Sequence, residues 1–324
     1  MKLSLFELCI TRPLGFIIST IYDIVQNYGL AIILFTVIVK LILLPLQIKS
    51  QKAMKKQQKI QPIIAELQKK YANDQQRLQQ EMMKVYKENN VSMTGGCLPL
   101  LIQMPILIGL YRVIQSPLTY IKGINFTDST VLESAKNIIS EMTSKFPDVI
   151  GNISSMKIEQ IVKNYQIQLT TWADLLEKTA DLGWDINFNF LGINLSKIPS
   201  ASIAPIMSGN FSDMSTVLLV LIPALAIFTT WLSMKQTQGA TQQQNNSAAN
   251  DTAQSMSKSM TMMMPIMTGF FTFTLPSGIG IYWIISSITQ MLQYYFLNKY
   301  FDTKEDDFVV KLPAKNRKNS KKHR

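Results

Sequence analysis

The chain has 324 residues, of which 47% are hydrophobic and 16% are charged, and its formal net charge is +11. Soluble domains contain about 25% charged residues, so this composition is unusual for a single water-soluble domain. The apolar residues gather in a few long stretches, which is typical of helical membrane proteins. We therefore expect an all-α polytopic membrane protein.

The residue inventory argues against several classes of chemistry. The only histidine is His323, near the end of a basic tail, which disfavours histidine-based proteolysis, zinc chemistry of the HExxH type and haem ligation. Cys9 and Cys97 show no metal-ligand spacing. The sequence has no GxxxxGK[ST] phosphate loop, so nothing indicates an ATP-driven pump. We expect no catalytic residue, no metal site, no cofactor and no enzymatic activity.

The N-terminal segment, 1–28, has two interpretations. Within it, residues 13–28 place apolar side chains at roughly helical spacing, which predicts an amphipathic helix lying at the membrane surface. An extension of the first membrane span is an equally good interpretation. Both place a helix immediately before that span.

Lys40 is the only charged residue of the first predicted span, 29–48, and lies in the otherwise apolar stretch 30–46. A charge near the middle of a membrane helix costs about 2.5–3.5 kcal/mol on insertion scales, so it usually faces a water-filled cavity or a partner. The alternative is snorkelling, in which the long side chain reaches along the helix to the interface. Lys40 is therefore the first candidate functional residue.

Apolar spans and polar connections alternate along the rest of the chain. Segment 49–94 predicts a basic helical hairpin that breaks near Asn73, and a mixed-polarity region of about 100 residues follows the second span. That region is either a small domain or a set of interfacial helices. The remaining predicted segments are spans 95–114, 216–234, 260–275 and 276–298, the region 115–215, a flexible loop 235–259 and a basic tail 299–324.

The charge distribution predicts an orientation. Segment 49–94 has ten basic and four acidic residues, segment 299–324 has nine and four, and region 115–215 has seven and ten. The positive-inside rule places the first two in the cytoplasm, so the N-terminus and region 115–215 lie outside. Because the basic patches flank apolar spans, they do not form the face of one soluble nucleic-acid-binding domain.

Three stretches, in this order, carry a resemblance to a known family. They are YGLAIILFTVIVKLILLPL, GGCLPLLIQMPILIGLYRVI and MMMPIMTGFFTFTLPSGIGIYWIISSI, with a Lys-rich hairpin between the first two. Together they resemble the YidC/Alb3 family of membrane protein insertases, in its shorter Gram-positive type. Region 115–215 is longer than that type leads one to expect, so the resemblance says little about it.

The resemblance implies a mechanism in the bacterial plasma membrane. Five spans would surround a hydrophilic groove that is open to the cytoplasm and to lipid, with Lys40 at the position where the family usually has arginine. The groove would take the polar flank of a nascent membrane protein and release its apolar segment into the bilayer, without nucleotide hydrolysis. A small transporter or channel that uses the intramembrane lysine is the alternative function.

Other polar and aromatic residues are candidates for groove lining, each with a packing role as the alternative. They are Gln103, Thr229, Thr230, Tyr282, Trp283, Ser286 and Ser287. Lys318, Lys321, Lys322 and Arg324 in the tail are candidate contacts for the ribosome or for anionic lipid. The partners implied are nascent membrane proteins and membrane lipids, with the ribosome, bound by tail and hairpin, and the Sec translocon as candidates.

Overall fold

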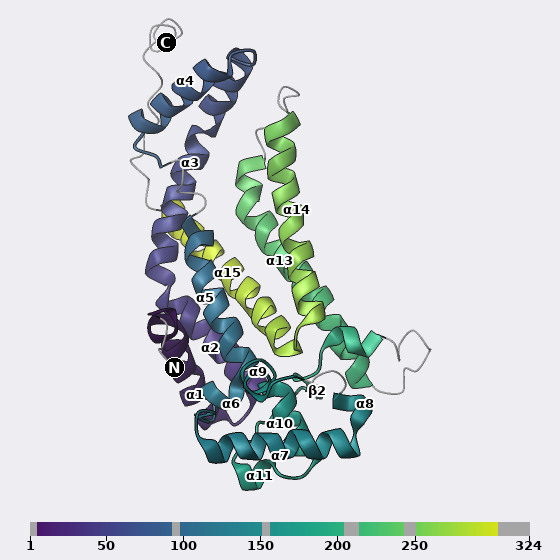
Figure 1. Cartoon of the computed structure of the whole chain (residues 1–324). Helices are drawn as coiled ribbons and strands as arrows, with labels where there is room; N and C mark the ends of the chain where they lie inside the picture. The colour runs from purple at the N-terminus through teal and green to yellow at the C-terminus, as the bar shows by residue number, and fades with distance from the viewer. Residues whose placement is uncertain (1–4, 93–97, 151–155, 204–213, 243–250, 304–324) are drawn as a thin grey trace, which may run out of the picture. The chain divides into compact units, whose positions relative to one another are not determined.

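A computed structural model describes residues 5–92, 98–150, 156–203, 214–242 and 251–303 (Figure 1). These residues are mostly helical, and their only sheet is one short antiparallel strand pair, so the predicted helical fold class is confirmed at this level. The chain divides into two compact units, which are described separately below. Unit 1 comprises Met1–Val39, Met104–Ile227 and Met267–Ser286, and unit 2 comprises Lys40–Gln103, Phe228–Ile266 and Ser287–Arg324.

The long helices coincide with the apolar stretches and with the basic hairpin. They are α1 (Arg12–Val25), α2 (Tyr28–Ile42), α3 (Leu44–Lys70), α4 (Gln75–Glu88), α5 (Leu98–Gln115), α13 (Met214–Gln242), α14 (Asp251–Thr274) and α15 (Ser277–Thr303). Helices α13 and α14 extend into the predicted loop 235–259, of which residues 243–250 lie outside the described chain.

Two helices in the described part of the chain are long and apolar enough to cross a membrane, namely Glu7–Val25 and Met214–Gln236. Helices α2 and α3 meet the same criterion only as a pair bent by 60°. Met104–Gln115 and Met263–Thr274 are shorter apolar helices. The sequence thus located the apolar helices, while the number of spans stays a prediction.

Helix α1 is separate from α2. Gln26 has a φ of 48°, in the left-handed region, and its N–H donates to the carbonyl of Tyr22, which ends α1. Helix α2 begins two residues later, at Tyr28. Of the two interpretations of the N-terminal segment, continuous extension of the first span is therefore wrong, and the surface location of α1 stays a prediction.

The core of unit 1 joins α1, α2, α5 and the start of α15. Tyr28 is fully buried, its hydroxyl donates to the carbonyl of Ile114 at 2.8 Å, and its ring meets Phe188 edge-on at 4.9 Å. Gly278 lies against Tyr28 and Ile32, where an added Cβ would come within 3.0 Å of the Tyr28 ring. These contacts hold the first turns of α2 and α15 together.

Residues 116–203 form a small domain, here called the middle domain. Its elements are α6 (Pro117–Tyr120), α7 (Ser129–Lys145), α8 (Pro147–Ile150), α9 (Ile158–Asn164), α10 (Gln166–Leu175), α11 (Thr179–Leu182), β1 (Asn189–Phe190), β2 (Ile193–Asn194) and a 3-10 turn (Pro199–Ser202). The strands pair Asn189 with Asn194 and Phe190 with Ile193. Leu191 and Gly192 between them both have positive φ, as a two-residue hairpin loop of type I′ requires.

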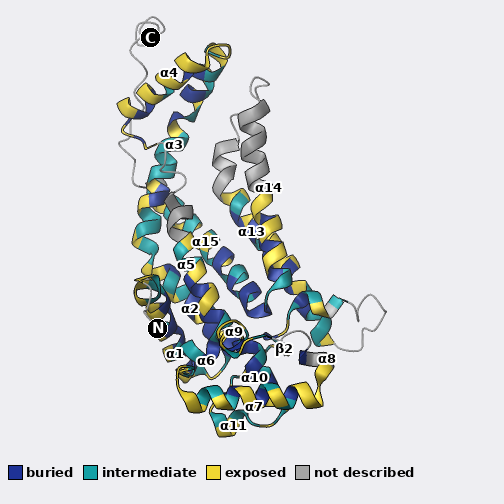
Figure 2. Cartoon of the chain, in the orientation of Figure 1, coloured by how far each residue is buried: buried dark blue, intermediate teal, exposed yellow. Residues whose placement is uncertain are grey.

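The middle domain has a hydrophobic core of its own. Figure 2 colours the helices of this domain by burial, with exposed and buried residues alternating along α7. Ile138 and Met142 of α7 pack with Trp172 of α10 and with Trp184, and all four residues are buried. A surface helix set would expose such residues or turn them to lipid. Of the two interpretations of region 115–215, the structure therefore supports the small domain.

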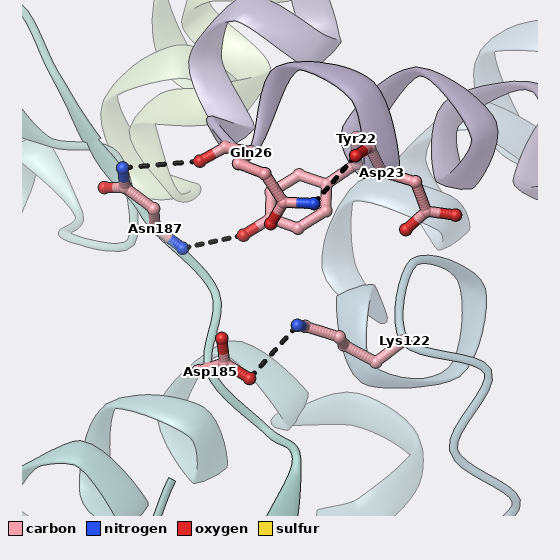
Figure 3. A network of polar contacts seen from close by, with 6 residues as sticks. All are labelled: Tyr22, Asp23, Gln26, Lys122, Asp185 and Asn187. Atoms are coloured by element: carbon pink, nitrogen blue, oxygen red, sulfur yellow. Dashed lines mark hydrogen bonds and ion pairs between the residues drawn. The ribbon is translucent and has the colours of Figure 1, made fainter. Parts of the chain in front are cut away.

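Polar contacts fix the middle domain to α1 (Figure 3). The N–H of Asn187 donates to the hydroxyl of Tyr22 at 2.9 Å, and its side-chain amide donates to the carbonyl of Gln26 at 3.4 Å. Beside these contacts, Lys122 and Asp185, which both belong to the middle domain, form an ion pair at 3.1 Å. Tyr22 and Gln26 thus hold the segment that leads into the strand pair.

The same domain caps the N-terminus of α15. The N–H and the hydroxyl of Ser277 both donate to the carbonyl of Lys197, at 3.0 and 2.8 Å, and the N–H of Gly278 donates to the carbonyl of Leu195 at 3.2 Å. The first N–H groups of a helix have no partner within the helix. Backbone carbonyls of the middle domain supply partners for two of them.

Glu141 predicts a modest acid sensitivity of the middle domain. Hydrogen bonds from Lys145, at 2.8 Å, and from Lys178 hold the pKa of the Glu141 carboxyl below its usual value. A group whose pKa is lower in the folded state contributes stability at neutral pH and loses it as the pH falls through the folded-state pKa. Glu141→Gln should therefore lower the melting temperature at pH 7 by at most a few degrees, because the pair is solvent-exposed.

The difference between Glu141→Gln and the unchanged chain should shrink below the ordinary glutamate pKa of 4.5. Thermal melting of the detergent-solubilised protein between pH 3 and 8 would measure it. Glu133→Gln is the matched control, because Glu133 also pairs with a lysine of α7, Lys136, but at 3.6 Å. A melting difference for Glu141→Gln that stays constant across this range would contradict the linkage.

Unit 2 contains the helical hairpin of α3 and α4. Ile60, Ile64 and Leu67 of α3 pack against Leu78 and Val85 of α4. The chain turns between the two helices, and the carboxylate of Asp74 caps α4 by accepting from the N–H of Arg77 at 3.0 Å. The turn lies where the sequence predicted the break.

Candidate functional site

Lys40 lies in the last turn of α2 and is almost completely buried, with 4% of its surface exposed. No carboxylate lies within ion-pair distance of its ammonium group among the residues that the structure describes. Thr36, one turn earlier, is also buried, but its hydroxyl donates to the carbonyl of Ile32 at 2.6 Å. Within the described residues, Lys40 is thus a buried lysine without an acidic partner.

The helix breaks three residues after Lys40. Helix α2 ends at Ile42, α3 begins at Leu44, and the two axes differ by 60°. Pro45 explains the break, because proline has no N–H for the preceding turn and its ring clashes with the carbonyl four residues earlier. The side-chain amide of Gln293, in α15, donates to the carbonyl of Lys40 at 3.1 Å.

Further polar contacts follow α15 on both sides of Gln293. The hydroxyls of Ser287 and Thr230, from α13, lie 3.4 Å apart. Toward the other end, the amide of Gln51, from α3, donates to the side chain of Asn298 at 3.1 Å. We call this set of unit 2 residues the polar seam: Lys40, Gln51, Thr230, Ser287, Gln293 and Asn298.

The polar seam is unusual because most of it is buried. Gln51, Thr230 and Ser287 have buried side chains, as does Lys40. Polar groups within a membrane are costly unless they are hydrogen-bonded or face water. Helix α15 thereby contributes polar contacts to α13, α2 and α3 in turn.

Four further predicted site residues have described side chains, two of them polar and two aromatic. Thr229 is half-buried beside Thr230 in α13 of unit 2, whereas Ser286 is buried in unit 1. Tyr282 belongs to the core of unit 1, and Trp283 stacks on Phe271 with ring centroids 6.3 Å apart. These two aromatic side chains thus have packing contacts, whatever else they do.

Gln103 is part of α5, but its side chain is not described. The tail candidates lie outside the described residues: Lys318, Lys321, Lys322 and Arg324. Their predicted roles stay predictions.

Sequence reasoning missed Gln51, Gln293 and Asn298. Gln293 carried a signal, because it is a polar residue within the predicted span 276–298. Gln51 carried none, because it stands in a run of lysines and glutamines where every residue looks solvent-exposed. Asn298 lies at the end of a span, where a polar residue is ordinary.

The hollows on the surface of unit 1 lie elsewhere. One of about 420 Å³ is lined by residues of α7 and α9 such as Ser140 and Ile158, and one of about 370 Å³ lies between Arg12 and Tyr120. Neither contains a predicted site residue.

Within the described chain, no group of three or more His, Cys, Asp or Glu side chains is placed to hold a metal ion. The predicted hydrophilic groove stays a prediction.

The family model described as 60Kd inner membrane protein matches residues 20–305, which include α2, α13, α15 and every residue of the polar seam. The chain belongs to this family. The resemblance to YidC/Alb3 proteins noted from the three sequence stretches is thereby confirmed. Together with the apolar helices, membership of the 60Kd inner membrane protein family makes the chain an all-α, multi-pass membrane protein.

Three relatives in the 60Kd inner membrane protein family carry the name membrane protein insertase YidC. The protein from Clostridium perfringens is 51% identical over 124 residues, 38% of this chain and 52% of the relative. The protein from Clostridium tetani is 54% identical over 111 residues, which are 34% of this chain and 50% of the relative. The protein from Fusobacterium nucleatum is 27% identical over 286 residues, which are 88% of this chain and 93% of the relative. The match thus spans about half the length of the first two relatives.

Proposed function

We propose that this protein is a membrane protein insertase and chaperone of the bacterial plasma membrane. The observation that carries the proposal is the buried cation of Lys40, which has no acidic partner in the described chain. The five predicted spans contain no aspartate or glutamate at all. A buried charge persists only with a partner or with water. The partner that fits is the acidic or polar flank of a client protein.

The physical task is to move a polar segment across about 30 Å of hydrocarbon. Each unpaired polar group costs several kcal/mol there, so a hydrophilic groove reaching partway into the membrane shortens the costly distance. Lys40 attracts acidic client residues into that groove. Release then follows from burial of the client's apolar surface in lipid, at about 25 cal/mol per Å². No step in this sequence needs nucleotide hydrolysis.

The polar seam supports a groove beside Lys40. Thr230 and Ser287 present hydroxyls on α13 and α15, and Gln293 presents an amide within the same unit. These groups offer hydrogen bonds to a passing backbone without the cost of further charges. Lys40 is buried among protein side chains, so it does not lie on a lipid-facing surface along which its side chain could snorkel.

The orientation and partners follow from charge. The N-terminus and the middle domain lie outside, and the α3–α4 hairpin and the tail lie in the cytoplasm, as the positive-inside rule predicts. The basic hairpin and tail suit the ribosome and anionic lipid, at about 1 kcal/mol per basic residue near a charged surface. A Sec translocon is a further candidate partner for clients with long translocated segments.

Reconstitution tests the proposed function directly. The purified chain in lipid vesicles should insert a small client that has an acidic translocated flank, measured by protease protection. Insertion should exceed that of protein-free vesicles and persist after enzymatic removal of nucleotides. A transporter or channel would instead leave insertion unchanged and dissipate an ion or proton gradient across the same vesicles, which would overturn the proposal.

A further inference from the structure

We infer that Gln293 is a positioning residue for Lys40, holding the end of α2 at the bend so that the ammonium group points in one direction. The inference rests on the proposed function for its biological meaning, but its structural part can be tested without it. The observation is the hydrogen bond from the Gln293 side-chain amide to the Lys40 carbonyl, at 3.1 Å.

The Lys40 carbonyl needs a donor from outside α2. The last carbonyls of a helix have no partner within the helix, and α2 ends only two residues after Lys40, at Ile42. In a continuous helix the Lys40 carbonyl would accept from the N–H of Leu44, four residues later, but Leu44 begins α3 on the other side of the 60° bend. Gln293 supplies the donor that the break removes.

A buried carbonyl without a donor is costly, so the bend and the Gln293 contact support one another. A side chain leaves the backbone in a direction set by the dihedral angles of its own residue. When the Lys40 carbonyl is tied to α15, the peptide plane of Lys40 is fixed, and with it the direction of the Lys40 side chain. Without the tie, the last turn of α2 can fray and the ammonium group can adopt several positions.

Helix α15 is a suitable anchor because it is held on both sides of Gln293. Ser287 meets Thr230 of α13, and Asn298 meets Gln51 of α3. Ser287 and Asn298 are six residues before and five residues after Gln293, about 9 and 8 Å along the helix axis. The donor amide therefore comes from a segment whose position is already fixed in unit 2.

The choice of residue at 293 matters in a specific way. Methionine has a similar length but no donor, so Gln293→Met removes the hydrogen bond with little change in volume. Glutamate keeps the shape but, when ionised, can only accept, so Gln293→Glu places two acceptors against one another. Gln290, one turn earlier on α15 and exposed, is the matched control site.

The first experiment measures geometry alone. In a chain with Cys9→Ser, Cys97→Ser and Lys40→Cys, the backbone carbonyl at position 40 remains, and the rate of alkylation of the new thiol by a small charged reagent reports its surroundings. Gln293→Met should change that rate by about threefold or more, and Gln290→Met should leave it unchanged. Equal rates in all three chains would overturn the inference.

The second experiment separates positioning from general stability. In the chain with Lys40, Gln293→Met and Gln293→Glu should lower client insertion, the second more strongly, while Gln290→Met should not. In a Lys40→Leu background, Gln293→Met should cause no further loss, because it acts through Lys40. Equal proportional losses in both backgrounds would show a merely structural role. A further outcome is that the unsubstituted protein inserts no client although Gln293→Met changes the alkylation rate. That result would refute the proposed function and leave the positioning role of Gln293 intact.

Discussion

Lys40→Leu should lower insertion of a client with an acidic translocated flank by about tenfold or more, whereas Lys40→Arg should retain insertion. Two opposite charges about 4 Å apart attract by roughly 1 kcal/mol in water and roughly 4 kcal/mol at the effective dielectric of a protein surface, and 1.4 kcal/mol corresponds to a factor of ten. Leucine removes that attraction and leaves the span fully apolar. Arginine keeps the positive charge, which is the property that the mechanism uses.

Complementation of an insertase-depleted bacterium would measure the Lys40 effect, with equal expression of every variant. Lys52→Leu is the matched control, because Lys52 is an exposed lysine early in α3 and should be dispensable. A second control is a client whose translocated flank has no acidic residue, for which the loss should be smaller. Normal insertion by Lys40→Leu would mean that the buried cation has no part in the activity.

Trp184→Ala should destabilise the middle domain by about 3–5 kcal/mol, the cost of removing a large aromatic side chain from a packed core. Trp184 is only 2% exposed and its ring meets Phe126 edge-on at 5.9 Å. It also directly precedes Asp185, whose ion pair with Lys122 joins two segments of the middle domain. Loss of the tryptophan therefore weakens the packed core and disturbs the ion pair beside it.

Limited proteolysis and thermal melting of the detergent-solubilised chain would measure the Trp184 effect. Cleavage within residues 116–203 should become much faster while α13 and α15 stay protected. Leu175→Ala is the control, because Leu175 lies in the same domain but is 52% exposed, and surface substitutions usually change stability by less than about 0.5 kcal/mol. Equal cleavage rates for the two variants would refute a packed core around Trp184.

The sequence predicted the long helices well because long apolar stretches have few other stable structures in a membrane. It missed the 60° bend between α2 and α3, since Pro45 close to the end of an apolar stretch looks like the end of a span. The secondary-structure elements of the middle domain could not be predicted from the sequence. Apart from α7, its helices have only four to ten residues and are too short for a reliable hydrophobic period.

The candidate site was only partly predictable for a similar reason. Lys40 stands out because charge in an apolar stretch is a local property of the sequence. The contact between Gln293 and Lys40 is not local, because the two residues are 253 positions apart and belong to different helices. Tyr282 and Trp283 were suggested by a motif, and the structure adds packing contacts that the motif does not reveal.

The separate core of the middle domain has an evolutionary consequence. Ile186 packs against that core and also against the core formed by α1, α2, α5 and α15, so it lies where the two cores adjoin. Residues of the domain's own core, such as Met142, can therefore change without disturbing the packing of the long helices, whereas Phe188 belongs to the core of those helices. A lineage could lengthen, shorten or exchange this module by mutation or recombination, provided that the chain still returns to cap Ser277 and Gly278.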